Sequence, residues 1–231
     1  MNRFFKKLCL CVFLAARATI TVADGESESV FDFETAGVDT PPAAFTAALT
    51  GSGSAVSWLV KEVTAPPSGK RVVAQLSQDK TNRRYPILIH NGIEARDVDL
   101  SVRFKTISGQ VDASGGLIFR YQNSDNYYVV RANSLENNVV AYKTESGRRD
   151  SIGINAKNAA YGVAVEVPHK VWNTLRVVVR SDLFEIYLNN RKLFEVTNDV
   201  FTEPGKIGLW TKADAVTYFD DLRIQVLDEV K

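Results

Sequence analysis

Residues 171–196 read VWNTLRVVVRSDLFEIYLNNRKLFEV, and residues 201–226 read FTEPGKIGLWTKADAVTYFDDLRIQV. Apolar and polar side chains alternate in these segments with a period of two, as in Phe184-Glu185-Ile186. This alternation is typical of half-buried antiparallel strands and not of helices. Asn189-Asn190 can adopt the positive φ of a tight hairpin, and Ser181-Asp182 provides another turn. The C-terminal part of the chain therefore predicts an antiparallel sheet.

The rest of the chain continues the strand pattern. Val98, Leu100, Val102 and Phe104 alternate with polar residues and should share one face of a strand. Other strands are predicted at residues 31–34, 58–63, 71–75, 85–89, 117–121, 127–131, 138–144 and 149–154. Residues 35–56 are rich in Ala, Thr, Pro, Gly and Ser and read as a long surface loop. The prediction is an all-β sandwich of two antiparallel sheets, with the first and last strands close together.

Several motifs resemble a known family. Its members carry a strand that opens with Trp and Leu, as at residues 172–188, and then the pair LN before the next strand, as at 188–189. PGKIGLWT follows, as at 204–211, and then FDD, as at 219–221. GGLIFRYQNSDNYYVVRAN at 115–133 resembles the central hairpin, and FDFE at 31–34 resembles the opening strand. The chain is thus similar to secreted bacterial concanavalin-A-like, laminin-G-like jelly rolls, close to the 3-keto-disaccharide hydrolase-like (family-16-glycosidase-like) branch. The resemblance implies a jelly roll of the concanavalin-A-like lectin/glucanase type, a fold that carries lectins, glycosidases and inert spacers alike.

Composition indicates one ordinary domain without a nucleic-acid partner. The chain has 231 residues, 24% of them charged and 45% hydrophobic, and a formal net charge of +1. A chain of this length can bury a sizeable core without disulfides or metal. Binding to phosphate backbones is driven by a basic excess, which this chain lacks. The pairs Arg83-Arg84 and Arg148-Arg149 are predicted to be solvated loop charge.

The first 23 residues are predicted to be a secretory signal peptide. Arg3, Lys6 and Lys7 precede an apolar run at residues 8–16, and Thr21-Val22-Ala23 offers small residues for cleavage. The run is too short for a mature transmembrane helix, which needs about 20 apolar residues. We expect a periplasmic or extracellular protein with one jelly-roll domain at 24–231 and no membrane contact after cleavage. Both cysteines, Cys9 and Cys11, lie in the removed segment.

No glucanase catalytic motif is present. Laminarinase-type jelly rolls place their paired carboxylates on one strand as E-x-D-x-E, and Glu94-Ala95-Arg96-Asp97 has the wrong spacing. The family resemblance nevertheless implies a hydrolase or lyase that acts on a (3-keto-)disaccharide or another glycoside. The leading hypothesis is noncatalytic carbohydrate or glycan binding, and a scaffold module that binds another protein is a third possibility.

The predicted carbohydrate site lies on the hairpin at 117–131. If the turn spans Gln122 to Asp125, then Arg120, Tyr127, Arg131 and Asn133 share one partly exposed sheet face. An aromatic ring can stack on a pyranose and a guanidinium can bind hydroxyls. The alternative is a solvated face with an Arg120–Tyr127 cation–π pair. His90, at a strand end, is a further candidate. If the hairpin face is only a solvated surface, the binding site is expected at the loops around His90 and Lys212.

A structural calcium ion is the one cofactor that the sequence suggests. In the alternation of the last strand, Asp220 falls on the same face as Tyr218, Leu222 and Ile224. Its carboxylate would then point toward apolar side chains, where it must be paired, protonated or bound to a cation. Asp32 lies on the opening strand, which should neighbour the last one. Two carboxylates and loop carbonyls would satisfy calcium. The alternative is a β-bulge in which Asp220 accepts backbone hydrogen bonds.

Overall fold

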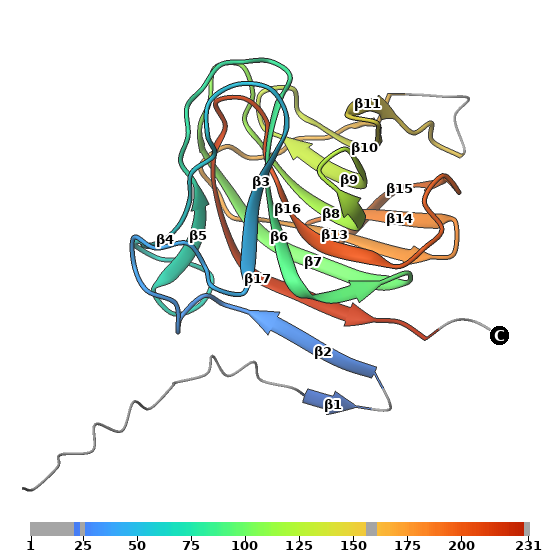
Figure 1. The fold of residues 1–231 in the computed structure, drawn as a ribbon, viewed down its shortest axis with the longest axis horizontal. Coiled ribbons are helices and arrows are strands. Elements are labelled where there is room, and N and C mark those ends of the chain that lie inside the picture. The colour runs from blue at the N-terminus through green and yellow to red at the C-terminus, as the bar shows by residue number, and fades with distance from the viewer. Residues whose placement is uncertain (1–20, 24–25, 156–160, 229–231) are drawn as a thin grey trace, which may run out of the picture.

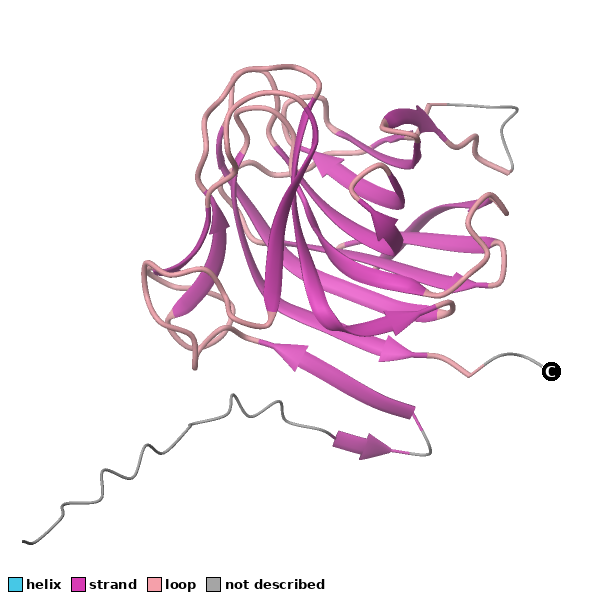
Figure 2. Ribbon diagram, in the orientation of Figure 1, coloured by secondary structure: helices cyan, strands magenta, loops and turns pink. Residues whose placement is uncertain are grey.

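Strands in two packed sheets make up the described part of this chain. The computed structural model describes residues 21–23, 26–155 and 161–228. All the elements within these ranges are strands, which pair in two antiparallel sheets (Figure 1, Figure 2). No helix with the length and hydropathy to cross a membrane occurs among these residues. The predicted all-β jelly-roll sandwich is confirmed.

The nine-stranded sheet has the order β1-β2-β17-β7-β13-β14-β15, with β5 paired to β17 and to β4. Its strands are β1 (Thr21–Ala23), β2 (Glu26–Phe31), β4 (Trp58–Glu62), β5 (Arg71–Gln75), β7 (Val98–Ser108), β13 (Asn173–Arg180), β14 (Leu183–Leu188), β15 (Arg191–Thr197) and β17 (Val216–Val226). The opening strand β2 pairs with the last strand, where Phe31 lies opposite Leu222. The predicted proximity of the first and last strands is therefore confirmed.

The eight-stranded sheet has the order β11-β10-β9-β8-β16-β6-β3, with β12 paired to β10. Its strands are β3 (Phe45–Gly51), β6 (Arg84–Ala95), β8 (Ser114–Asn123), β9 (Asn126–Asn133), β10 (Asn138–Glu145), β11 (Arg148–Ser151), β12 (Val163–Ala164) and β16 (Gly205–Trp210). Strand β3 corrects the prediction of a loop over 35–56. Ala and Thr differ little in polarity, so this strand shows no clear alternation of apolar and polar residues. Phe45 is nevertheless buried at one end of the strand, and the whole strand pairs with β6.

The main core lies between the two sheets. Val98, Leu100, Val102 and Phe104 of β7 are buried and face inward, as predicted, while the residues between them are half-exposed. The central strands of the eight-stranded sheet differ, because β8 and β9 are buried on both faces over most of their length. A strand that is buried on both faces needs apolar residues at consecutive positions. Something must therefore cover the outer face of this sheet.

Loops cover part of that outer face at one end of the sandwich, which we call the loop end. It is formed by residues 52–57, 76–83, 109–113, 134–137 and 211–215, several of which meet above the sheets in Figure 1. Arg84 joins three of these loops, because its fully buried guanidinium donates hydrogen bonds to the carbonyls of Ser54, Ala55 and Ala213 and to the hydroxyl of Ser77. The prediction that Arg84 is solvated loop charge is wrong, since the carbonyls of these loops replace its water.

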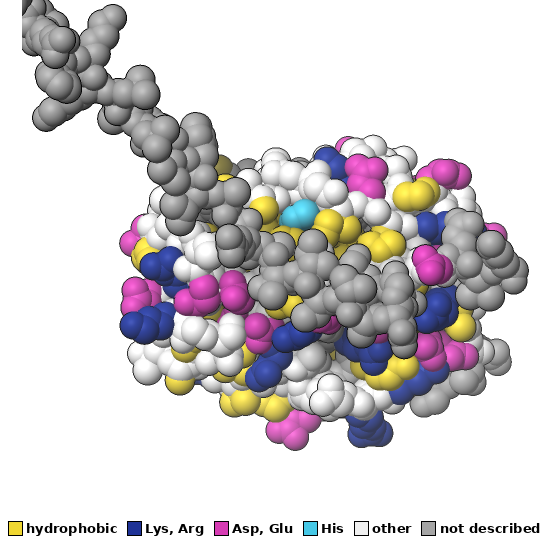
Figure 3. Space-filling model, turned by 90° about the horizontal axis from the view of Figure 1, so that it is seen from below, with side chains coloured by type: hydrophobic (Ala, Val, Ile, Leu, Met, Phe, Trp, Pro, Cys, Tyr) yellow, Lys and Arg dark blue, Asp and Glu magenta, His cyan; other side chains and the backbone are white. Residues whose placement is uncertain are grey.

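The signal-peptide prediction falls largely outside the described residues, which begin at Thr21. Residues 21–23, at the predicted cleavage site, form β1 and pair with β2. The face of the molecule seen in Figure 3 carries basic and acidic side chains intermixed among the described residues, in keeping with the near-zero net charge.

Candidate functional site on the outer face of the eight-stranded sheet

A second apolar cluster lies on the outer face of the eight-stranded sheet, and we call it the outer-face cluster. Its residues alternate along the strands with those of the main core. They are Tyr85, Ile87, Ile89, Ile118, Tyr127, Val129, Val140, Tyr142 and Trp210. Gly116 lies beneath Trp210: a Cβ there would come within 3.3 Å of the indole and of Arg131. The missing side chain lets these two large groups pack side by side on the sheet.

The central hairpin does not place the four predicted sugar-binding residues on one exposed face, so that prediction is wrong. A β-bulge shifts the register between Phe119 and Asn123, where Asn123 pairs with Asn126. Arg120 sits in the bulge with a φ of 48°. Its side chain therefore turns to the inner side of the sheet, and its guanidinium carbon lies 5.7 Å from the centre of the Phe184 ring in the main core.

Arg120 has a structural role in this position. It is 1% exposed and donates hydrogen bonds to the carbonyls of Arg96, Phe201 and Ser181 and to the Asp97 carboxylate. These partners belong to segments from both sheets. Although burial lowers the pKa of Arg120, an arginine with this many partners stays charged. The side chain ties the sheets together at the end opposite the loop end.

Three other predicted site residues are buried as well. Tyr127 is fully buried in the outer-face cluster, and its hydroxyl lies 3.0 Å from that of Thr50. Asn133 is fully buried and accepts backbone hydrogen bonds from Leu135 and Glu136, which shapes the loop between β9 and β10. The third, Arg131, is 2% exposed. The predicted site required partly exposed side chains, and none of these three is exposed.

His90 is also held inside the fold. Its Nδ1 accepts hydrogen bonds from the backbone N–H groups of Gly92 and Ile93, and its ring packs 4.6 Å from that of Phe31. Burial, and then the charge of Lys206, lower the pKa of His90. The neutral imidazole lies inside β6, which continues to Ala95, so the prediction that His90 ends a strand is wrong.

Arg131 is the centre of a polar network at the loop end. Its guanidinium donates hydrogen bonds to Asn138 and, over 2.7 Å, to the Glu136 carboxylate. It also contacts the hydroxyls of Tyr142 and Tyr161 at 3.1 and 3.2 Å. Burial opposes its charge, but Tyr142 and Glu136 raise the pKa of Arg131 above its usual value. The guanidinium of Arg131 therefore keeps its positive charge just below the surface.

Two of these partners reach the surface. Tyr161 is 55% exposed, and the Glu136 side chain is 41% exposed. Although partial burial works against it, the Arg131 charge lowers the pKa of Glu136, so this carboxylate is ionised at neutral pH. Leu135 and Val111, on neighbouring loops, are exposed apolar side chains. An aromatic ring, a carboxylate and apolar side chains are therefore accessible above the buried Arg131.

A second carboxylate lies deeper in the same network. Asp112 is 1% exposed, accepts hydrogen bonds from Ser114 and Asn133, and lies 3.5 Å from the ammonium group of Lys212. Burial raises the pKa of Asp112, against the opposing effect of Ser114 and the nearby positive charges. Lys212, whose loop was the alternative predicted location of the binding site, is thus part of this site.

Arg149 closes the outer-face cluster from above. Its guanidinium carbon lies 4.2 Å from the centre of the Tyr142 ring, 4.7 Å from Tyr85 and 5.2 Å from Trp210. Arg149 belongs to the edge strand β11, whereas Tyr85 belongs to β6 on the far side of the same sheet. The sheet must therefore curl strongly for one side chain to reach both. The prediction of solvated charge is wrong for Arg149 too, because aromatic faces replace its water.

The prediction that Asp220 lies on the same strand face as Tyr218, Leu222 and Ile224 is wrong. A bulge between Asp220 and Arg223, with Asp221 at a φ of 47°, changes the alternation, so that Phe219, Leu222 and Ile224 face the core. Asp220 instead accepts hydrogen bonds from the backbone of Ser68 and Asp221. This is the bulge alternative.

Asp32 accepts a hydrogen bond from the backbone N–H of Glu34. The described residues contain no group of three His, Cys, Asp or Glu side chains that could hold a metal ion. Calcium binding stays a prediction.

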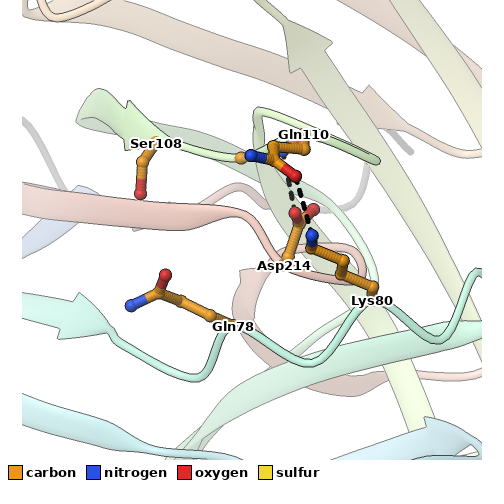
Figure 4. Close-up of a pocket in the computed structure, with 6 residues that line it drawn as sticks. Gln78, Lys80, Ser108, Gln110 and Asp214 are labelled. Atoms are coloured by element: carbon orange, nitrogen blue, oxygen red, sulfur yellow. Dashed lines mark hydrogen bonds between the residues drawn. The ribbon is translucent and has the colours of Figure 1, made fainter.

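A shallow pocket of about 180 Å³ adjoins the network at the loop end (Figure 4). Gln78, Lys80, Ser108, Gln110 and Asp214 line it, and Lys80 donates a hydrogen bond to Gln110. Asp214 accepts three backbone hydrogen bonds from residues 110–112. The polar groups of the pocket therefore mostly bind one another and fix the loop that carries Asp112.

The sequence analysis missed Glu136, Tyr142, Tyr161, Asp112 and Arg149. The position of Tyr142 could have been predicted from the alternation along its strand, because it lies on the same face as Val140 and pairs with Val129 of the neighbouring strand. The others lie in loops or on a short edge strand, where no periodicity indicates a direction. Only the three-dimensional path of those loops brings them to Arg131.

Comparison with known proteins agrees with this fold. The carbohydrate-binding module CBM66 from Bacillus subtilis has a TM-score of 0.59 and 18% identity over 78% of this chain and 94% of its own. The cellulose-induced protein Cip1 has a TM-score of 0.61 and 11% identity over 87% of this chain and 98% of its own. At these identities the similarity shows the jelly-roll fold alone. No curated protein matches the chain significantly.

The family itself is shown by sequence. Residues 49–225, which hold every residue of the Arg131 network, match the model of the 3-keto-alpha-glucoside-1,2-lyase-like domain. That range is well over half of the chain. The resemblance stated from the motifs is confirmed, and this protein belongs to the 3-keto-alpha-glucoside-1,2-lyase-like domain family.

Proposed function

We propose that this protein binds a carbohydrate at the loop end of its eight-stranded sheet, over the Arg131 network. The observation that carries the proposal is the exposed ring of Tyr161, which is joined through its hydroxyl to Arg131 and stands near the ionised Glu136. A sugar ring presents an apolar C–H face to an aromatic ring and hydroxyls to charged groups. The site offers both kinds of contact within one hydrogen-bonded network.

Two comparisons support a carbohydrate as the ligand. The family is named for 3-keto-α-glucosides, and one structural neighbour is described as a carbohydrate-binding module. A keto group is a hydrogen-bond acceptor, which suits a site whose members Arg131 and Lys212 are donors. A 3-keto-α-glucoside is therefore the first ligand to test.

A second candidate is the lyase reaction in the family name, which the ionised Glu136 favours. In a 1,2-elimination a base removes the proton at C2, next to the 3-keto carbon, and the C1–O bond breaks. The aglycone leaves as an alcohol once it gains a proton, and the sugar keeps a C1–C2 double bond. Glu136 is an accessible base, and the cationic Arg131 would stabilise the enolate that forms.

One set of experiments separates the two candidates. Methyl 3-keto-α-D-glucopyranoside and methyl α-D-glucopyranoside are titrated calorimetrically into the protein, and methanol release is followed in parallel. Binding without methanol supports a binding module. Methanol release that Glu136→Gln abolishes while binding persists supports the lyase. If neither sugar binds and a glycan array is also blank, the carbohydrate proposal is wrong.

We also propose that the protein acts outside the cytoplasm, as a secreted or periplasmic domain. The support is the order of basic start, apolar run and small residues in the first 23 positions. Export would bring the site into contact with sugars outside the cell.

A further inference from the structure

Polar atoms of two arginines at the outer-face cluster are buried and have no hydrogen-bond partner among the described residues. They are Nε of Arg131 and Nη1 of Arg149. Oγ1 of Thr144 and Nε1 of Trp210 also make no hydrogen bond of ordinary geometry, but the Tyr127 hydroxyl interacts with both. Buried polar groups in native proteins are nearly always paired, so unpaired ones call for an explanation. Both arginine atoms are N–H donors.

The surroundings of these donors identify the kind of ligand that would satisfy them. They lie beside the rings of Tyr85, Tyr142 and Trp210, of which Tyr85 and Trp210 are stacked with centres 5.6 Å apart. A ligand that fits must present apolar C–H groups to the rings and oxygen acceptors to the donors. A pyranose ring does both.

Arg149 occupies the place where such a ring would stack. Its guanidinium lies over all three rings within 5.2 Å, yet its Nη1 finds no acceptor there. We propose that Tyr85, Tyr142 and Trp210 form a pyranose-stacking subsite, and that Arg149 fills it as a plug which the sugar displaces. This inference rests on the proposed function and adds to it a subsite that the Arg131 network alone does not provide.

The attachment of Arg149 suits a displaceable group. Strand β11 has four residues, lies at the edge of the sheet and, among the described strands, pairs only with β10. It follows the turn at Ser146 and Gly147, both at positive φ. Moving the side chain breaks cation–π contacts but no paired core strand. Arg131 links the subsite to the surface, because it contacts both Tyr142 and the exposed Tyr161.

The first experiment tests the subsite without any sugar. Arg149→Ala removes the plug, and Arg148→Ala is the matched control, because the neighbouring Arg148 side chain is 81% exposed. Methylguanidinium chloride, at concentrations too low to denature, should refill the vacated subsite. It should raise the melting temperature of Arg149→Ala in a saturable way, but not that of wild type or of Arg148→Ala. If Arg149→Ala gains nothing, the three rings do not form a standing subsite, and the inference is wrong whatever the sugar results.

The second experiment tests displacement. Methyl 3-keto-α-D-glucopyranoside should bind Arg149→Ala about tenfold more tightly than wild type, because the sugar no longer competes with the guanidinium. Arg148→Ala should bind like wild type. Arg149→Gln, which shortens the side chain and removes its charge but keeps a polar end, provides the same comparison if the alanine variant does not fold.

The outcomes separate this inference from the proposed function. Equal or weaker binding by Arg149→Ala makes Arg149 a bystander or a sugar contact, which overturns the plug and leaves carbohydrate binding in place. A positive methylguanidinium result with no sugar binding by any variant overturns the pyranose assignment together with the proposed function. It would leave an aromatic subsite for cations.

Discussion

The guanidinium of Arg131, which is 2% exposed, donates a hydrogen bond of 2.7 Å to the carboxylate of Glu136, whose side chain is 41% exposed. This pair links the buried outer-face cluster to the surface. The arginine contacts the Tyr142 hydroxyl, and the carboxylate also accepts a hydrogen bond from Asn138 while its side chain stays partly exposed to a ligand. Charge-assisted contacts of this kind fix direction as well as strength. The pair therefore orients the site proposed above it.

Arg120 should matter for stability. Arg120→Ala removes the donor that serves three carbonyls and leaves the Asp97 carboxylate, at 6% exposed, without its cation. Breaking a buried pair in this way costs about 3–5 kcal/mol. Urea denaturation should show a loss of this size, whereas Arg148→Ala should change the free energy of unfolding by less than about 0.5 kcal/mol. Equal stabilities of the two variants would show that Arg120 does not tie the sheets.

Asp220 should make stability depend on pH. Burial raises its pKa to about 7, despite hydrogen bonds from Ser68 and Asp221, whereas its unfolded value is 3.8. Because the folded pKa is the higher one, the folded state keeps the proton longer. The contribution to stability is complete below pH 4 and is lost as the pH rises through 7. The loss is on the order of 4 kcal/mol for a shift of this size.

Asp220→Asn tests this pH dependence. The amide oxygen can still accept a backbone hydrogen bond, and the variant cannot ionise. The decline in the free energy of unfolding between pH 4 and 7 should flatten in Asp220→Asn and persist in Asp182→Asn, a change at an exposed position. A decline that is identical in wild type and Asp220→Asn would contradict the raised pKa.

The calcium prediction has its own test. If Asp32 and Asp220 hold a calcium ion, excess chelator lowers the melting temperature of wild type but not that of Asp220→Asn, because a ligand of the folded state stabilises by mass action. If Asp220 only caps the bulge, chelator leaves both melting curves unchanged and elemental analysis finds no calcium. The hydrogen bonds from Ser68 favour the second result.

Processing of the N-terminus is predicted after Ala23. N-terminal sequencing of the exported protein should begin at Asp24. Cleavage there would also remove β1, which pairs only with β2. A mature protein that still begins at Met1 would contradict both the signal peptide and the extracytoplasmic location.

The fold could be predicted from sequence because period-two alternation is a local signal. It placed β7, β13 and β14 correctly, since each has one face in the core and the other in solvent. It failed at β3, where Ala and Thr weaken the contrast between the faces. It also failed at the bulges that contain Arg120 and Asp221, because extra residues in one strand change which face the side chains there occupy.

The candidate site could be predicted only in part. Arg131 was identified from its strand, and Lys212 from its loop, but the buried state of Arg84, Arg120 and Arg131 was not foreseen. Arginine is expected at the surface, and whether carbonyls, carboxylates or rings take the place of water depends on distant segments. Glu136, Tyr161 and Arg149 meet Arg131 or its neighbours only after the loops have folded.

The most direct test of the carbohydrate site is a calorimetric titration of methyl 3-keto-α-D-glucopyranoside into Tyr161→Ala. Tyr161 is 55% exposed, so its loss should leave folding intact while it removes a stacking surface. Tyr187→Ala is the control, because Tyr187 lies under Arg176 on the other sheet. We expect about tenfold weaker binding by Tyr161→Ala, or roughly 1.4 kcal/mol, and wild-type binding by Tyr187→Ala. Wild-type affinity in Tyr161→Ala would contradict a sugar site over the Arg131 network.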